Sequence, residues 1–337
     1  MTDVLYAAVS GDAPCLDCFR IGSEGIAEPA SRTLLPGGPA DLALSPGGRF
    51  LYVDVGVGKV HQALSFRVDA ASGALEPIGT PAHVGPYPCY ISVDGSGRFL
   101  LAAYYSDGMV TVHAIGPDGV VGEPVQKLES APRAHFIQTD AANCYAFAPH
   151  VCNENAIWQF RFDARTGQLT PNDVPKASPG PGHGPRHMCF HPNGRFAFSN
   201  GEQGSSVTAW SYAAGAGHLA PLQSLSTLPE GWAGDNTCSQ IHLTPDGRFL
   251  YSCNRGHHSL AGFAVDGATG GLTALGQFPA EPTPRPTAIS PDGRWLFNAG
   301  GSPRLVCYRI DGKSGALERT GHLEPGPVAW LLAARLG

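Results

Sequence analysis

The sequence contains few charged residues and neither a basic nor a long apolar run. Asp, Glu, Lys and Arg make up 15% of its 337 residues, and the formal net charge is −6. Without a cluster of Lys and Arg, nucleic-acid binding is not expected. No window approaches the roughly eighteen uninterrupted apolar residues of a membrane span, and the N-terminal stretch MTDVLYAAVSGDAP lacks the segments of a signal peptide. We therefore expect a soluble, cytoplasmic protein with no nucleic-acid or membrane partner.

Disulfide and nucleophile motifs are also missing. The nine cysteines have no framework spacing, which indicates reduced thiols packed in strands. Cys15 and Cys18 form the one close pair, but they lie in a strand-like stretch and not at the start of a helix, so a redox role is not expected. The sequence has no G-x-S-x-G motif, and this disfavours an acyl-enzyme mechanism.

Glycine and proline, in contrast, are abundant, and they punctuate a repeat. The chain has 44 Gly and 30 Pro, which favours many turns over long helices. Five segments share an apolar run, a Gly-containing turn, Arg, an aromatic residue and a second apolar run, as in IHLTPDGRFLYSCNR; FIQTDAANCYAFAPH is a sixth copy with Cys in the Arg place. The reference positions, 46 to 53 residues apart, are Arg49, Arg98, Cys144, Arg195, Arg248 and Arg294.

This interval is typical of a β-propeller blade, and each copy continues into two further strand-like segments. The C-terminal PGPVAWLLAARL resembles the first strand of a unit, and the N-terminal DVLYAAVSGDAPCLDCFRIG resembles the second and third. Together they complete a seventh unit. We predict an all-β fold: a seven-bladed β-propeller with four antiparallel strands per blade, a single domain over residues 1–337, whose ring is closed by N- and C-terminal strands that share one blade.

Two register positions in each unit are predicted to line the central mouth on one face of the propeller. Nine residues before the reference position lie Ala40, Cys89, His135, Arg186, Ser239 and Arg285. Seven residues after it lie Gly56, Tyr105, Val151, Glu202, Arg255 and Gly301. One arginine at a strand end is usually solvated or ion-paired, but the coincidence of a histidine, a glutamate and several arginines at equivalent places indicates a site.

The chemistry of these residues favours a small anionic ligand. Arg186 and Arg255 can bind a carboxylate or phosphate through paired hydrogen bonds. Their charge stabilises the carboxylate form of Glu202, and His135 is available as a base. With a base and no nucleophile motif, the simplest reaction is attack of water on an ester-like carbonyl, with an arginine stabilising the oxyanion.

The stretch GHGPRHMCFHPNG suggests a metal site at first, because its three histidines are evenly spaced. The repeat places it on a strand, where the four residues from His187 to His191 span roughly 13 Å, too far for both to bind one metal. We therefore expect no metal here, His191 in a turn, and His187 as a packing residue beside Arg186.

The segments GPRHMCFHPNGRFAFSNGE, TPDGRFLYSCNRGHHSLAGFAVD and GPYPCYISVDGSGRFLLAAYYSDGMVTV resemble the propeller-type 6-phosphogluconolactonases, a lactonase family that also includes the fungal carboxy-muconate lactonizing enzymes. The likeness runs from end to end, including GPVAW. It implies a lactone or its open acid as ligand, no required metal or cofactor, and a site of His135, Arg186, Glu202 and Arg255. The chain departs from the family at Tyr104, at Gln240 and around His135, which bears on substrate identity.

We therefore expect a hydrolase that opens a sugar-acid lactone, phosphorylated or not. The expected catalytic residues are His135, Glu202, Arg186 and Arg255, and the expected substrate-binding residues are Tyr105, His187, Ser239, Gln240 and Arg285. One alternative is an intramolecular lactonizing cycloisomerase acting on a carboxylated muconate. A second is a non-enzymatic propeller scaffold, against which the lack of Trp-Asp and Gly-His repeat signatures counts.

Overall fold

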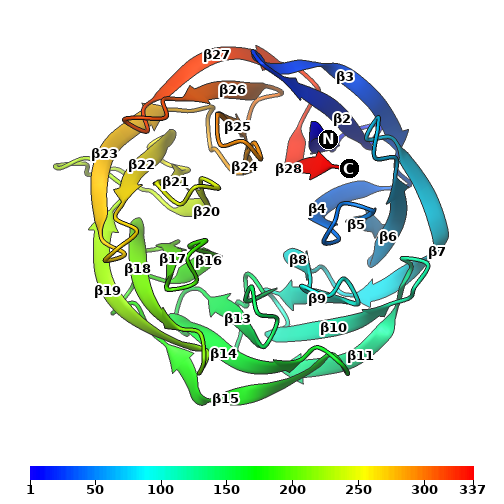
Figure 1. Cartoon of the computed structure of the whole chain (residues 1–337), viewed down its shortest axis with the longest axis horizontal. Helices are drawn as coiled ribbons and strands as arrows, with labels where there is room; N and C mark the ends of the chain where they lie inside the picture. The colour runs from blue at the N-terminus through cyan, green and yellow to red at the C-terminus, as the bar shows by residue number, and fades with distance from the viewer. The chain divides into compact units, whose positions relative to one another are not determined.

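The computed structural model describes the backbone of residues 1–337 and every side chain except those of Ala27 and Glu28. Its regular structure consists of strands, β1 to β28, arranged in seven four-stranded antiparallel sheets. These are the blades of the predicted seven-bladed β-propeller (Figure 1). In the part of the chain that is described, no helix is long and apolar enough to cross a membrane.

Each blade follows the chain in order, except the one that joins the two ends. Blade 1 consists of β28 (Val328–Leu336), β1 (Thr2–Val9), β2 (Cys15–Gly22) and β3 (Gly25–Leu34). Blade 2 consists of β4 (Gly38–Leu44), β5 (Phe50–Val57), β6 (Val60–Val68) and β7 (Leu75–Gly85). Blade 3 consists of β8 (Tyr90–Val93), β9 (Phe99–Tyr104), β10 (Met109–Ile115) and β11 (Val121–Glu129). Blade 4 consists of β12 (Gln138–Thr139), β13 (Tyr145–His150), β14 (Ala156–Asp163) and β15 (Gln168–Ala177).

The three remaining blades repeat the same order. Blade 5 consists of β16 (Pro185–Phe190), β17 (Phe196–Gly201), β18 (Ser206–Ala213) and β19 (His218–Ser226). Blade 6 consists of β20 (Cys238–Leu243), β21 (Phe249–Asn254), β22 (Ser259–Val265) and β23 (Leu272–Pro279). Blade 7 consists of β24 (Thr287–Ile289), β25 (Trp295–Ala299), β26 (Leu305–Ile310) and β27 (Leu317–Leu323).

The residues form two compact units. Unit 1 comprises Met1–Ala148, Phe160–Asn172 and Gly326–Gly337, and unit 2 comprises Pro149–Gln159 and Asp173–Pro325. Blades 1 to 3 therefore belong to unit 1 and blades 5 to 7 to unit 2, while the strands of blade 4 run through both. That the chain is a single domain over residues 1–337 stays a prediction.

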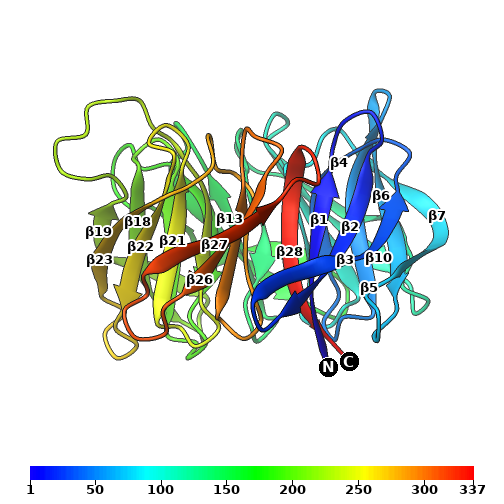
Figure 2. The same ribbon diagram turned by 90° about the horizontal axis from the view of Figure 1, so that it is seen from above.

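The two ends of the chain share blade 1, as the sequence predicts. Strand β28 pairs antiparallel with β1 from Thr2 opposite Leu336 to Val9 opposite Val328. Figures 1 and 2 show the N- and C-terminal ends side by side in this blade. An exposed pair, Arg335 Nε to Asp3 Oδ1 at 2.7 Å, lies near the end of this pairing.

The repeated turn between the first two strands depends on one aspartate and one residue with a positive φ. Asp94 Oδ1 accepts hydrogen bonds from the backbone N–H groups of Arg98 and Phe99, both at 2.8 Å. In blade 4, Asp140 Oδ1 makes the same two bonds one repeat later. Asn143 adopts φ 57° where other copies have glycine, because asparagine tolerates this left-handed region. The sixth copy is therefore confirmed despite its missing Gly and Arg.

Apolar residues of neighbouring blades interdigitate within each unit, and most cysteines join them. In unit 1, Val4 and Tyr6 of β1 pack in one cluster with Leu51 and Val53 of β5. All nine cysteines are free, and burial raises the pKa of Cys18 to about 11. The prediction that the thiols pack in strands holds for six of them and is wrong for three, which lie outside the strands: Cys89, Cys144 and Cys152.

Candidate active site

Irregularities in two inner strands set the direction of the predicted site residues in unit 2. The β16–β17 register shifts between Pro185 and Met188, and the β20–β21 register shifts at the equivalent place. Such a bulge bends the strand and re-aims the side chains beside it. Arg186 and His187 lie in the first bulge, and Asn200 Oδ1 accepts a hydrogen bond from the His187 N–H at 3.0 Å. The predicted positions Arg186 and Ser239 therefore both lie in a bulge of an inner strand.

The guanidinium group of Arg186 is almost completely buried and held on the neighbouring blade. Its side chain is 3% exposed, and Nη1 donates to the backbone carbonyl of Ser239. Asn200 Nδ2 donates to the same carbonyl at 3.2 Å. The guanidinium group of Arg186 is thus held in place by a backbone carbonyl of the neighbouring blade.

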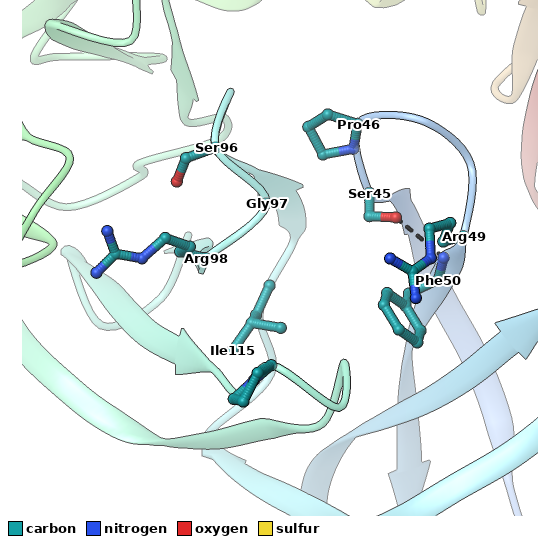
Figure 3. Close-up of a pocket in the computed structure, with 10 residues that line it drawn as sticks. Ser45, Pro46, Arg49, Phe50, Ser96, Gly97, Arg98 and Ile115 are labelled. Atoms are coloured by element: carbon teal, nitrogen blue, oxygen red, sulfur yellow. Dashed lines mark hydrogen bonds between the residues drawn. The ribbon is translucent and has the colours of Figure 1, made fainter.

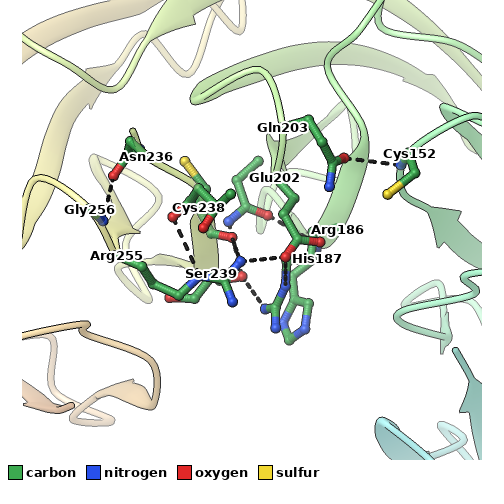
Figure 4. Close-up of polar contacts among 12 residues, drawn as sticks. Cys152, Arg186, His187, Glu202, Gln203, Asn236, Cys238, Ser239, Arg255 and Gly256 are labelled. Carbon is green, nitrogen blue, oxygen red and sulfur yellow. Dashed lines mark hydrogen bonds and ion pairs between the residues drawn. The ribbon is translucent and has the colours of Figure 1, made fainter. Parts of the chain in front are cut away.

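Glu202 joins Arg186 to the second predicted arginine (Figure 4). Its Oε1 accepts a hydrogen bond from Nη2 of Arg255 and lies 3.7 Å from Nε of Arg186. The carboxylate is 12% exposed and the Arg255 side chain 22%. The other oxygen, Oε2, is buried and accepts no hydrogen bond from any residue that the structure describes. Two positive charges thus surround one negative charge, which leaves the cluster with a net positive charge.

Arg255 also lines a cavity of about 430 Å³ together with Asp235, Asn236, Thr237 and Gly256. The Arg255 Nη2 donates to Cys238 O at 3.2 Å, and Asn236 Oδ1 accepts the Gly256 N–H at 2.9 Å. These bonds hold Arg255 and Gly256 at the wall of the cavity.

Trp232 lies beside this cavity and was not predicted. Its ring contacts the His257 ring edge-on at 4.5 Å, and His257 follows Gly256 of the cavity wall. The indole is exposed on the loop that precedes β20. Positions at a fixed sequence distance from the reference residue lie at strand ends. Trp232 lies in a connection whose length differs between blades, so the repeat does not indicate it.

Three of the predicted substrate-binding residues lie at the junction of blades 6 and 7. Ser239 Oγ donates to Pro284 O at 2.7 Å, and Gln240 Oε1 accepts the Thr287 N–H at 2.8 Å. Both side chains are buried and hold the start of β24. Arg285 is different, because its side chain is exposed and makes no hydrogen bond or ion pair with the described residues, while its backbone N–H donates to Ala299 O at 3.0 Å. That Ser239, Gln240 and Arg285 bind substrate stays a prediction.

Unit 1 brings together the predicted residues Tyr105 and His135. Their rings meet edge-on with centroids 5.6 Å apart, and His135 is 7% exposed. Arg133, which was not predicted, donates from Nη1 to the Tyr105 hydroxyl at 2.6 Å and lies over the ring at 5.3 Å. It adopts φ 71°, a conformation that is unusual outside glycine and that no register count reveals.

The three histidines of GHGPRHMCFHPNG lie at different places around β16. His183 precedes the strand, and its Nδ1 is 2.8 Å from Ser206 Oγ. His187 is buried in the strand, and His191 follows it in the turn, where its ring packs against Phe196 with centroids 6.2 Å apart. The expected positions on one strand, with His191 in the turn, are confirmed.

A cavity of about 510 Å³ in unit 1 contains none of the predicted site residues (Figure 3). Two reference arginines of the repeat, Arg49 and Arg98, line it. Each lies over the ring of the aromatic residue that follows it, and Arg98 Nη2 donates to Arg165 O at 3.1 Å. The repeat itself therefore accounts for these two arginines as packing and turn-binding residues.

The chain is a seven-bladed propeller, and comparison with known proteins shows that its class is that of the propeller lactonases. The model of the family described as "Lactonase, 7-bladed beta-propeller" matches residues 16–331, and the chain belongs to this family. A relative from Pectobacterium carotovorum subsp. carotovorum, named 6-phosphogluconolactonase, is 35% identical over 94% of each chain. One from Pectobacterium atrosepticum with the same name is 34% identical over 94% of each.

The solved structure of a periplasmic gluconolactonase from Pseudomonas aeruginosa is also similar. It superimposes with a TM-score of 0.91 and 28% sequence identity and covers 100% of both chains. The chain is therefore a lactonase, a hydrolase. A cytoplasmic location stays a prediction.

Proposed function

We propose that the protein hydrolyses the lactone of a sugar acid, with 6-phosphogluconolactone or its unphosphorylated counterpart as substrate. The observation that carries the proposal is the Glu202 carboxylate between Arg186 and Arg255, because this cluster is positively charged and lies beside a cavity. The names of the relatives support both candidate substrates, since they include 6-phosphogluconolactonases and a gluconolactonase.

In the proposed mechanism, water attacks the lactone carbonyl carbon after Glu202 has accepted its proton; His135, the other candidate base, lies in unit 1. An arginine of the cluster stabilises the oxyanion that develops on the carbonyl oxygen, which is worth about 10²- to 10³-fold in kcat for one donor. The ring C–O bond then breaks with its electron pair going to the ring oxygen, which takes the proton from the protonated base and leaves as a hydroxyl group. Glu202 fixes the two guanidinium groups so that little reorganisation is needed during the reaction.

Anion binding in the proposal involves three arginines. Arg186 and Arg255 can bind a carboxylate or phosphate while bonded to Glu202, since each guanidinium has five N–H donors. Arg285 is exposed and provides a further cation in unit 2. His187 completes the proposed set in unit 2 as a buried neighbour of Arg186, and Tyr105 lies with His135 in unit 1.

A hydrolysis screen tests the proposal. Phosphorylated and unphosphorylated aldonolactones are followed by proton release in a pH-stat, and a carboxylated muconate by loss of ultraviolet absorbance. We expect proton release with at least one aldonolactone, and loss of about 10²-fold or more in Arg186→Ala. Arg195→Ala is the matched control, because this arginine is exposed and bonds Ala268 O at 3.1 Å in a turn.

Two results would contradict the proposal. Turnover of the muconate without hydrolysis of any lactone would identify a cycloisomerase. Lactone hydrolysis that is unaffected by both Arg186→Ala and His135→Ala would show that the chemistry takes place elsewhere.

A further inference from the structure

An exposed tryptophan lies beside the Arg255 cavity, and the proposed mechanism gives it no role. Trp232 is 40% exposed in the connection between β19 and β20. Its ring meets the His257 ring edge-on, with the centroids 4.5 Å apart. A single exposed apolar residue is ordinary on a protein surface. Trp232 differs because the residues around it hold the ring next to the cavity wall.

The connection itself places the Trp232 ring against one segment of this wall. A Cβ at Gly234 would lie 2.7 Å from Cζ2 and 3.0 Å from Cε2 of the indole, so a residue with a side chain here would displace the ring. Gly234 directly precedes Asp235, which lines the cavity. The indole therefore lies beside the segment of the wall that leads into β20.

His257 holds the same ring from the second segment of the wall. It follows Gly256, which lines the cavity, and its Nδ1 lies 2.8 Å from Ser259 Oγ. Its backbone N–H donates to Asn236 Oδ1 at 3.1 Å, and the same oxygen accepts the Gly256 N–H at 2.9 Å (Figure 4). One asparagine thus orders both the cavity wall and the histidine that contacts the tryptophan.

The cavity combines the groups that a sugar ring requires, and all of them lie in unit 2. Arg255 provides a cation for a carbonyl, carboxylate or phosphate oxygen. Asp235, Asn236 and Thr237 provide side chains that hydrogen-bond to hydroxyl groups. A sugar ring also presents C–H groups, and an aromatic ring offers these a flat apolar surface. The indole beside the wall supplies that surface.

We propose that the indole ring of Trp232 stacks on the sugar ring of the lactone while Arg255 binds the oxygen atoms of the same molecule. This inference rests on the proposed function and adds a substrate-binding residue to it. The stacked C–H groups lie away from the reacting carbonyl carbon, so the contact is equally strong in the ground state and the transition state. Such a contact lowers KM without raising kcat.

The kinetic test compares Trp232→Ala and Trp232→Phe in the full-length protein, with the aldonolactone that the wild type hydrolyses best. We expect KM to rise about 5- to 30-fold in Trp232→Ala, as for the loss of one stacked aromatic ring, with kcat changed less than about twofold. Trp232→Phe keeps a ring and should stay within about threefold of the wild-type KM. Leu222→Ala is the matched control, because Leu222 is 49% exposed in β19 of the same unit, and it should behave as wild type.

Tryptophan fluorescence provides a second measurement that does not depend on turnover. The probe is the lactam of the same sugar acid, which keeps the ring and whose amide bond resists hydrolysis. We expect the lactam to change the emission of the wild type, and this change should be lost in Trp232→Phe although four tryptophans of the five remain. Inorganic phosphate has no C–H groups, so its affinity by calorimetry should be the same in wild type and Trp232→Ala.

The outcomes separate the two proposals. A wild type that hydrolyses no lactone overturns the proposed function and this inference with it. If the wild type is active, an unchanged KM in Trp232→Ala overturns the inference alone, and so does a fall in kcat at constant KM. If Trp232→Ala does not fold, the emission decides: a lactam-induced change that persists in Trp232→Phe overturns the inference, and its loss supports it.

Discussion

Neutralising Glu202 should convert the arginine cluster into a site that an added anion stabilises. Glu202→Gln keeps the size of the side chain and one oxygen to accept the hydrogen bond from Arg255. It removes the negative charge beside two guanidinium groups, one of which, on Arg186, is 3% exposed. The variant is then left with two like charges in a poorly solvated cavity wall.

The magnitude follows from the exposure of the three partners. Leaving a fully buried charge without its counter-ion costs about 3–5 kcal/mol. Arg255 is 22% exposed and Glu202 12%, so solvent screens part of this cost, and glutamine retains one bond. We therefore expect the free energy of unfolding to fall by about 2–3 kcal/mol at low salt. Phosphate or gluconate at 100 times its dissociation constant should recover about 2.7 kcal/mol.

Urea unfolding in a low-salt buffer, with and without the anion, measures both numbers. Glu281→Gln is the matched control, because Glu281 is also buried and pairs with Arg319 at 3.1 Å. Its arginine is 46% exposed and lies outside the candidate site. The control variant should lose stability without regaining it in phosphate.

Equal unfolding free energies for wild type and Glu202→Gln would refute the electrostatic reasoning. Equal recovery by anion in Glu202→Gln and Glu281→Gln would refute the specificity of the cluster for anions. Either result would mean that the ion pairs of Glu202 with Arg186 and Arg255 do not form an anion-binding cluster.

Three further predictions concern the fold. Asn143→Ala should lower the unfolding free energy by about 1–2 kcal/mol and Asn143→Gly by less, since alanine disfavours φ 57°; urea titration distinguishes them. Burial lowers the pKa of His242 to about 4, so the stability that it contributes is present above its unfolded pKa of about 6.5 and is lost as pH falls. From pH 8 to pH 5, protonation of the half-buried His242 ring should lower the free energy of unfolding by about 1–2 kcal/mol. The variant His242→Gln should lack this part of the acid sensitivity. Deletion of Val328–Leu336 removes the partner strand of β1, so the unfolding transition followed by circular dichroism should no longer be cooperative.

The sequence predicts the blades well because the repeat reflects local turn chemistry. In most copies an aspartate, serine or threonine accepts backbone N–H groups, and a residue with positive φ follows, so the turn closes without help from distant contacts. Even the divergent copy could be found, since Asp140 and Asn143 perform these two functions. The number of strand-like segments at the N- and C-terminal ends is enough to predict that the two ends share one blade. This prediction also needs no knowledge of side-chain packing.

The candidate site is less predictable, because a register position specifies where a Cα lies and not what its side chain contacts. Equivalent positions give Arg186 and Ser239, but Ser239 bonds Pro284 O while its own carbonyl binds Arg186. Arg133 and Trp232 lie in connections whose lengths differ from blade to blade, so no repeat distance leads to them.

The residues that form the cluster in unit 2 also join its blades, and this links rigidity to the proposed chemistry. Arg186 of blade 5 binds the carbonyl of Ser239 in blade 6, and Ser239 Oγ binds the segment leading into blade 7. A guanidinium held in this way is already directed when the ligand arrives, so little of the binding free energy is spent on ordering it. Loosening the bond between Ser239 and Pro284 should therefore weaken anion binding by Arg186. Precise placement of the arginines depends on the same blade contacts that stabilise the propeller.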